Sequence, residues 1–130
     1  MEITVVGVGY VGLVVGTCLS DFGLNVTCVD NDDQKIKLLR KGLVPIYEIG
    51  LNDLIHRNIE RERLHFTDNL GEAVESSSVV FIAVGTPPRD DGWTDLSAFM
   101  QVCKDIGSSM NGYKVVVIKS TVPVGTAQRA

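Results

Sequence analysis

Three glycines near the N-terminus and one aspartate further along have the spacing of a dinucleotide-binding site. Gly7, Gly9 and Gly12 fit the pattern G-x-G-x-x-G, and Asp30 follows at close to the usual separation of about 20 residues. In this pattern the first glycine allows a sharp turn, the second lets the backbone approach a pyrophosphate, and the third lets a helix pack closely on a sheet. The free N–H groups at the start of that helix would then face the pyrophosphate.

Asp30 indicates which dinucleotide such a site would take. A carboxylate at the end of the second strand accepts hydrogen bonds from both hydroxyls of an adenosine ribose, and it repels a 2′-phosphate at the same place. The four residues therefore predict an NAD site rather than an NADP site. The alternative is that the glycines only form a tight turn and that Asp30 only caps the next helix.

These residues need a strand before the glycines, a helix after them and a second strand that ends at Asp30. Short β-branched runs predict strands at residues 2–6 and 24–30, and the segment between them predicts a helix over 10–22 with Gly23 as its cap. The remaining sequence predicts strands at 64–67, 79–84 and 113–119, and helices at 32–41, 51–62, 96–110 and a short one that ends near 76. Strands that alternate with helices, several of them continuous apolar runs, predict an α/β fold. We expect a doubly wound parallel sheet with helices on both faces, as in Rossmann-type dinucleotide-binding domains.

The composition excludes several classes of protein. A length of 130 residues suits one domain, and a net charge of -4 without a basic block argues against nucleic acid as a partner. The sequence has no apolar run long enough for a membrane span and no signal peptide, so we expect a cytoplasmic protein without a membrane partner. The chain ends in residues typical of a helix start. We therefore expect residues 1–130 to be the cofactor domain of a longer chain, with a substrate domain after it.

The cysteines show no sign of a disulfide framework or of a metal site. Cys18, Cys28 and Cys103 have neither a C-x-x-C pair nor the spacing of metal ligands. We expect all three to be buried thiols in a reducing compartment, and we expect no metal.

Two threonines follow the fourth and fifth predicted strands. Thr86 lies in the segment GTPP and Thr121 in the segment STVPVGT. Ligands of doubly wound sheets bind beyond the carboxyl ends of the strands, so we expect both hydroxyls to converge on the cofactor side. The alternative is that they only satisfy backbone groups of the turns.

Taken together, these motifs resemble the UDP-glucose/GDP-mannose dehydrogenases. The segments that carry the resemblance are GVGYVG, VDND, PIYEIGL, FIAVGTPPRDDGWTDL and IKSTVPVGT, and they cover essentially the whole chain. AVGTPP and STVPVGT are specific to this family and are not general features of dinucleotide-binding folds. PIYE followed by GL is typical of the UDP-glucose branch, although Ile49 stands where that branch usually has proline. We expect the loop after Glu48 to be less rigid for that reason.

The resemblance implies an activity and a set of partners. The family oxidises a primary alcohol of a nucleotide sugar, UDP-glucose in this branch, to a carboxylate with two NAD molecules. It uses a cysteine nucleophile outside the matched part, so residues 1–130 alone should be inactive. The implied substrate is a UDP-sugar held with the missing domain, and the implied full-length protein is a homodimer.

The resemblance also implies roles for individual residues. Tyr10 and Val11 would line the dinucleotide cleft, and Lys35 would contact the adenosine ribose with Asp30. Independently, a cation five residues after Asp30 can reach the same hydroxyls or the phosphates, or it can be a solvated helix lysine.

Thr86 and Thr121 would lie near the nicotinamide ribose and the reacting centre. Thr121 is the one residue that we would place at the reaction itself, where it would help to position a water.

Other functions stay open at this point. A dinucleotide-sensing module without catalytic activity would carry the same glycines and acid, although it has no evident need for AVGTPP and STVPVGT. A dehydrogenase for GDP-mannose or for UDP-N-acetyl sugars would share most of the motifs.

Overall fold

The strand β1 (Glu2–Val6) lies at the centre of a five-stranded parallel sheet. The structure is a computed structural model that describes residues 1–130. The other strands are β2 (Asn25–Val29), β3 (Leu64–Thr67), β4 (Val79–Ile82) and β5 (Val115–Ile118). The helices are α1 (Tyr10–Asp21), α2 (Asp33–Arg40), α3 (Leu51–Glu60), α4 (Leu70–Ser76), α5 (Ser97–Ser109) and α6 (Thr126–Arg129).

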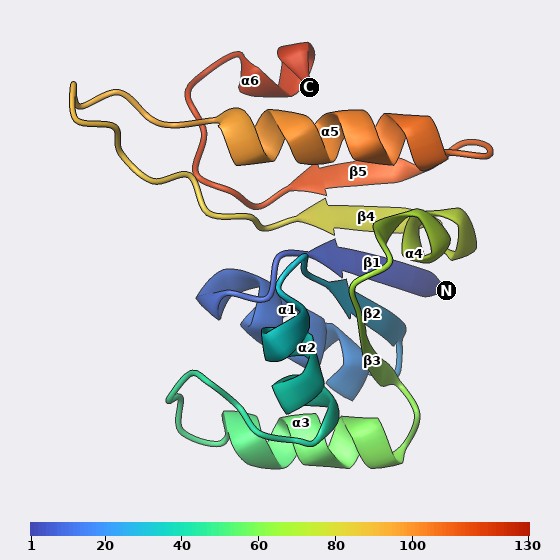
Figure 1. Cartoon of the computed structure of the whole chain (residues 1–130). Helices are drawn as coiled ribbons and strands as arrows, with labels where there is room; N and C mark the ends of the chain where they lie inside the picture. The colour runs from blue at the N-terminus through green and yellow to red at the C-terminus, as the bar shows by residue number, and fades with distance from the viewer.

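Alternate residues of β1 pack into two separate cores, one on each face of the sheet. Ile3 and Val5 join the core formed with α1, α2 and α3. Val6 joins the core formed with α4 and α5, and the hydroxyl of Thr4 donates to the carbonyl of Ala73 in α4 at 2.9 Å. Because side chains of a strand alternate between faces, this division places helices on both sides of the sheet, as Figure 1 shows. The predicted doubly wound parallel fold is confirmed.

The order of the strands, β3-β2-β1-β4-β5, creates the point at which a ligand would bind. The chain builds outward from β1 through β2 to β3, then crosses to the other side of β1 to form β4 and β5. Loops after β1 and β4 therefore leave the sheet in opposite directions, and a crevice opens between them.

The predicted elements all exist, and most of them end one or two residues earlier than predicted. The fourth strand was predicted to reach residue 84 but ends at Ile82, which pairs with Val6 at the end of β1. Beyond Val6 the chain turns at Gly7, so β1 has no further residues with which β4 could pair. Gly23 follows α1 with φ of 99°, as a helix cap requires.

The burial expected for β5 is wrong. Val115 is 45% exposed and Val116 is 40% exposed, because β5 is an edge strand with β4 as its one neighbour in the sheet.

The burial expected for all three cysteines is also wrong in part. Cys28 is buried on β2, Cys103 is half-buried, and Cys18 is exposed. The buried residues of α1 include Leu13, Gly16 and Thr17, so Cys18 lies on the opposite side of that helix. None of the helices combines the length and the hydropathy needed to cross a membrane.

Candidate functional site

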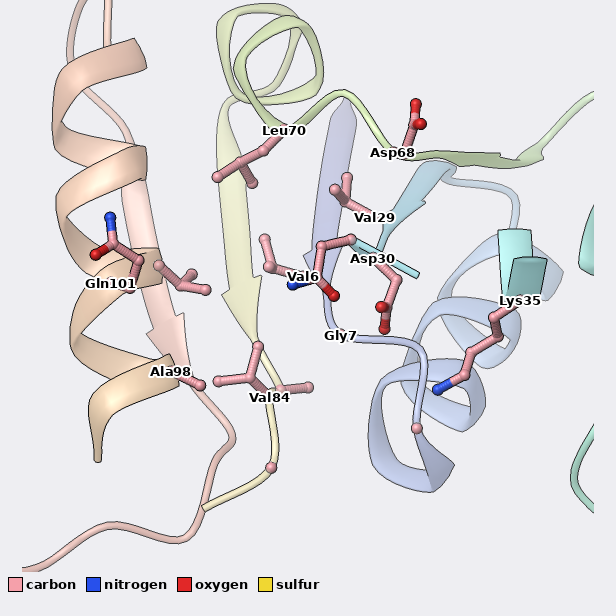
Figure 2. Close-up of a pocket in the computed structure, with 15 residues that line it drawn as sticks. Val6, Gly7, Val29, Asp30, Lys35, Asp68, Leu70, Val84, Ala98 and Gln101 are labelled. Atoms are coloured by element: carbon pink, nitrogen blue, oxygen red, sulfur yellow. The ribbon is translucent and has the colours of Figure 1, made fainter. Parts of the chain in front are cut away.

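A cavity of about 410 Å³ lies at the carboxyl edge of the sheet, where the loops after β1 and β4 separate. Gly7 and Gly9 line it after β1, and Asp30 and Lys35 line it from the end of β2 and from α2. Figure 2 shows the side chains of Asp30 and Lys35 on one side of this cavity and those of α5 on the other. Four of the residues predicted for the cofactor site are thus brought together around one cavity.

The three glycines differ in what a side chain would meet. A Cβ atom at Gly12 would lie 1.7 Å from the carbonyl oxygen of Gly7, and one at Gly7 would lie 2.7 Å from the carbonyl oxygen of Ala83. Nothing lies within 4 Å of a Cβ built at Gly9. Gly7 and Gly12 therefore serve close packing of the backbone, whereas the space at Gly9 is open for a ligand. This cradle fits the pyrophosphate of a dinucleotide.

The first turn of α1 presents unpaired N–H groups to the same space. Gly9 is the N-cap residue, and no side chain makes a capping hydrogen bond there. An anion can accept these N–H groups and gains from the positive end of the helix dipole.

Asp30 is held in place by two backbone groups. Its Oδ2 accepts the N–H of Val8 at 3.1 Å, and its Oδ1 accepts the N–H of Asp32 at 3.0 Å. Each carboxylate oxygen keeps a further lone pair for a ribose hydroxyl. The capping role that offered an alternative explanation belongs to Asp32, whose side chain accepts the N–H of Lys35 at 3.2 Å.

Lys35 lines the cavity without a carboxylate partner. The three ion pairs of the structure join Lys37 to Asp33, Arg57 to Asp21 and Arg89 to Asp91. The amine of Lys35 points toward the glycine-rich loop in Figure 2. Its charge is therefore available to a phosphate or to a ribose hydroxyl, which favours a binding role over that of a solvated lysine.

The loops that carry Thr86 and Thr121 meet, and neither threonine is among the residues that line the cavity. The hydroxyl of Thr86 donates to the backbone carbonyl of Thr121 at 2.7 Å, and the hydroxyl of Ser120 donates to the carbonyl of Val84 at 2.8 Å. These bonds join the loops after β4 and β5. The structure thus also fits the alternative explanation for Thr86, that its hydroxyl only pairs with a backbone group of a turn.

Tyr10 and Val11 lie on the first turn of α1, exposed and also outside the cavity lining. The hydroxyl of Tyr10 donates to the carboxylate of Glu48 at 2.6 Å. This hydrogen bond raises the pKa of Tyr10 above its ordinary value of 10.0, because it favours the protonated phenol, and the charge of Glu48 adds to the effect.

Two further parts of the cavity lining were not predicted from the sequence. Asp68 and Leu70 contribute from the loop before α4 and from the first residue of α4, and Ala98, Gln101 and Val102 contribute from the first turns of α5. The sequence feature that could have indicated Asp68 and Leu70 as lining residues is their position just after β3, at the same edge of the sheet. Ala98, Gln101 and Val102 lie beside the apolar stripe of α5 and carried no motif.

The family model of the UDP-glucose/GDP-mannose dehydrogenase family, NAD binding domain, matches residues 1–130. The chain belongs to this family. Among its relatives, the UDP-glucose 6-dehydrogenase of Rhizobium meliloti is 54% identical over 127 residues, which are 97% of this chain and 29% of that protein. The UDP-glucose 6-dehydrogenase TuaD of Bacillus subtilis is 49% identical over 98% of this chain and 28% of its own length.

Solved structures of family members have the same fold. A ternary complex of GDP-mannose dehydrogenase from Pseudomonas aeruginosa superposes with a TM-score of 0.95 at 40% identity, over 98% of this chain and 30% of that one. A UDP-glucose dehydrogenase from Pyrobaculum islandicum gives a TM-score of 0.91 at 37% identity, over 96% of this chain and 30% of that one. The chain thus spans less than a third of the length of these relatives.

These matches confirm the predicted family, the Rossmann-type fold and NAD as the cofactor. The domain is an NAD-binding domain of nucleotide-sugar dehydrogenases. A dinucleotide-sensing module is not favoured, because the curated relatives are dehydrogenases.

Proposed function

We propose that this domain supplies the NAD site of a dehydrogenase that oxidises UDP-glucose to UDP-glucuronate. The observation that carries the proposal is the identity of 54% to a UDP-glucose 6-dehydrogenase over nearly the whole chain. The cavity supports it, because the open space at Gly9 adjoins Asp30 and Lys35.

Each residue of the proposed site has a distinct task. The backbone at Gly7, Gly9 and Gly12 would receive the pyrophosphate, with the N–H groups of Tyr10 and Val11 beside it.

On the adenosine side, Asp30 would accept the ribose hydroxyls, and Lys35 would neutralise phosphate charge. On the other side, the joined loops of Thr86 and Thr121 would border the nicotinamide, and Thr121 would orient a water at the reacting carbon. Both loops are tied together by the hydrogen bond from Thr86, so the two threonines would act as one rigid edge.

The oxidation of a primary alcohol to a carboxylate takes two two-electron steps, and NAD held at this site would supply the hydride acceptor for each of them. The second step needs an activated nucleophile. Burial raises the pKa of Cys28 to about 12, so this thiol stays protonated, and neither Cys18 nor Cys103 lines the cavity. We therefore propose that residues 1–130 form the cofactor domain and that a further substrate domain supplies the nucleophile.

The proposed setting is the cytoplasm, where a full-length homodimer would act on a UDP-sugar. Three free cysteines suit a reducing compartment. GDP-mannose is the second candidate substrate, because a GDP-mannose dehydrogenase shares the fold with a TM-score of 0.95.

Two measurements test the proposal. Titration calorimetry should show that the chain binds NAD, and absorbance of NADH should show no turnover of UDP-glucose by the chain alone. A longer protein that contains this chain should form two NADH per UDP-glucose and should prefer UDP-glucose to GDP-mannose. A chain that binds no NAD would contradict the cofactor assignment, and a longer protein that prefers GDP-mannose would contradict the substrate assignment.

A further inference from the structure

Glu48 has no role in the proposed site, yet its carboxylate contacts the first residue of α1. The phenol of Tyr10 donates to it at 2.6 Å, and Tyr10 directly follows Gly9 in the chain. Glu48 belongs to the segment of residues 43–50 between α2 and α3, which we call the strap. The strap thus touches the helix end that faces the pyrophosphate site.

The glycine-rich loop between β1 and α1 is held by a carboxylate on each side. Asp30 accepts the N–H of Val8 on one side, and Glu48 accepts the phenol of Tyr10 on the other. Gly9 lies between these two contacts, and nothing packs where its side chain would be. A glycine without neighbours has wide conformational freedom, so the geometry of this turn depends on the restraints at either side.

Packing of the strap fixes the position of Glu48. Val44 and Ile46 pack against the core that α1, α2 and α3 share, and Leu51, just after the strap, is buried. Tyr47 is 89% exposed and Ile49 is 86% exposed, so the side chains on either side of Glu48 point to solvent. The strap is therefore anchored at both ends, and Glu48 is the residue that reaches back to α1.

The charge of Glu48 makes its location informative. A carboxylate near a pyrophosphate repels it, and Glu48 is hydrogen-bonded to Tyr10, the residue that directly follows Gly9. This repulsion by itself would lower the affinity for the cofactor. The hydrogen bond from Tyr10 offsets it, because it holds the turn in the geometry that binds the pyrophosphate. Pre-organisation of this kind raises affinity because less freedom is lost on binding.

We propose that Glu48 is a positioning residue for NAD binding: it holds Tyr10, and through Tyr10 the first turn of α1, in the geometry that receives the pyrophosphate. The proposal rests on the NAD site proposed above. It predicts that loss of either partner weakens NAD binding and that loss of both weakens it no further.

Titration calorimetry of NAD into the chain and its variants tests this coupling. Tyr10→Phe and Glu48→Ala should each raise the Kd about threefold to tenfold, in the range of one ordinary intramolecular hydrogen bond, because this pair is exposed to water. The double variant should match the single variants. Glu48→Gln keeps an acceptor for the phenol and should lose less affinity than Glu48→Ala. Tyr47→Phe is the matched control, because it removes a phenol from the same strap at a side chain that makes no hydrogen bond, and it should leave the Kd unchanged.

Hydrogen exchange at the first turn of α1 gives a second measure. Without NAD, the backbone amide of Leu13, which donates to the carbonyl of Gly9 at 3.0 Å, should exchange faster in Tyr10→Phe than in the parent chain, and NAD should restore its protection.

The outcomes separate this inference from the proposed function. If the parent chain fails to bind NAD, the proposed NAD site itself is wrong. If the parent binds NAD and Tyr10→Phe binds it equally well, with or without a change in Tm, the site stands and the role of Glu48 is wrong. Tighter binding by Glu48→Ala would show that repulsion outweighs positioning, and it would also overturn the inference.

Discussion

The carboxylate of Asp30 accepts the backbone N–H of Val8 at 3.1 Å, so the acid that ends β2 also holds the glycine-rich loop that follows β1. The residue that would select the cofactor is thus part of the scaffold of the pyrophosphate site. Changes at Asp30 are therefore expected to affect both selectivity and overall affinity.

The first prediction concerns the choice of cofactor. The chain should bind NAD more tightly than NADP, because a 2′-phosphate loses the hydrogen bonds to Asp30 and meets its negative charge. Each such hydrogen bond is worth about 1.5–3 kcal/mol, so the ratio of the two Kd values should exceed about tenfold. Asp30→Asn should reduce this ratio, since the amide keeps an acceptor for one backbone N–H but has no charge. Calorimetry with both cofactors measures the ratio, and equal or tighter binding of NADP by the parent chain would show that Asp30 was assigned wrongly.

The second prediction separates two glycines of one motif. Gly9→Val should leave the fold intact and weaken NAD binding more than about tenfold, since the new side chain enters the space for the pyrophosphate. Gly12→Ala should destabilise the fold by about 3 kcal/mol or more, because its Cβ would lie 1.7 Å from a backbone oxygen. Thermal unfolding and NAD titration of both variants check the contrast. A destabilised Gly9→Val with unchanged affinity would mean that Gly9 serves the turn and not the ligand.

The third prediction uses the pair of threonines. Thr86→Val removes the donor to the carbonyl of Thr121 and should lower the free energy of unfolding by about 1 kcal/mol. Thr121→Val should change it less, because the carbonyl that accepts the bond belongs to the backbone. Urea unfolding of both variants compares them. Equal effects would indicate that the hydroxyl of Thr121 contributes as much to the fold as that of Thr86.

The fourth prediction follows from the buried thiol. Burial raises the pKa of Cys28 from 9.0 to about 12, so the unfolded chain loses this proton first as the pH rises. The contribution of Cys28 to stability is therefore complete below pH 9 and falls as the pH approaches 12. Urea unfolding at pH 8 and pH 10 should show a smaller loss of stability for Cys28→Ala than for the parent chain. An identical loss in both proteins would mean that Cys28 ionises as readily in the folded chain as in the unfolded one.

The features that the sequence predicted are those set by local spacing. The turn at Gly7, the N-terminus of α1 and the acid at the end of β2 all lie within one strand–helix–strand unit, where β-branched runs and glycines determine the path. The parallel sheet with helices on both faces was predictable because buried apolar strands alternate with helices. At the start of α4, Asn69 accepts the N–H of Glu72 at 3.1 Å, which is the local hydrogen bond that a capping asparagine makes.

The features that escaped prediction depend on contacts between distant segments. The hydrogen bond from Tyr10 to Glu48 joins residues 38 positions apart, and no sequence motif of either residue indicates contact with the other. Gln101 lines the cavity only because α5 packs beside the crevice between the loops that follow β1 and β4. The exposure of Val115 and Val116 followed from the position of β5 in the sheet, since an identical apolar run at the centre would have been buried.

The open side of β5 bears on how the chain behaves at high concentration. An edge strand of four apolar residues presents a row of unpaired backbone N–H and C=O groups, which is a template for a strand of another molecule. Lysines commonly block such pairing, and Lys114 and Lys119 flank this strand. The amine of Lys114 is bound to the carbonyl of Ser77, just before β4, so Lys119 is the flanking lysine whose side chain is exposed and free to extend past the open edge. Self-association, and eventually precipitation, is thus expected to start at β5, and a charged residue in place of Val116 should raise the solubility limit.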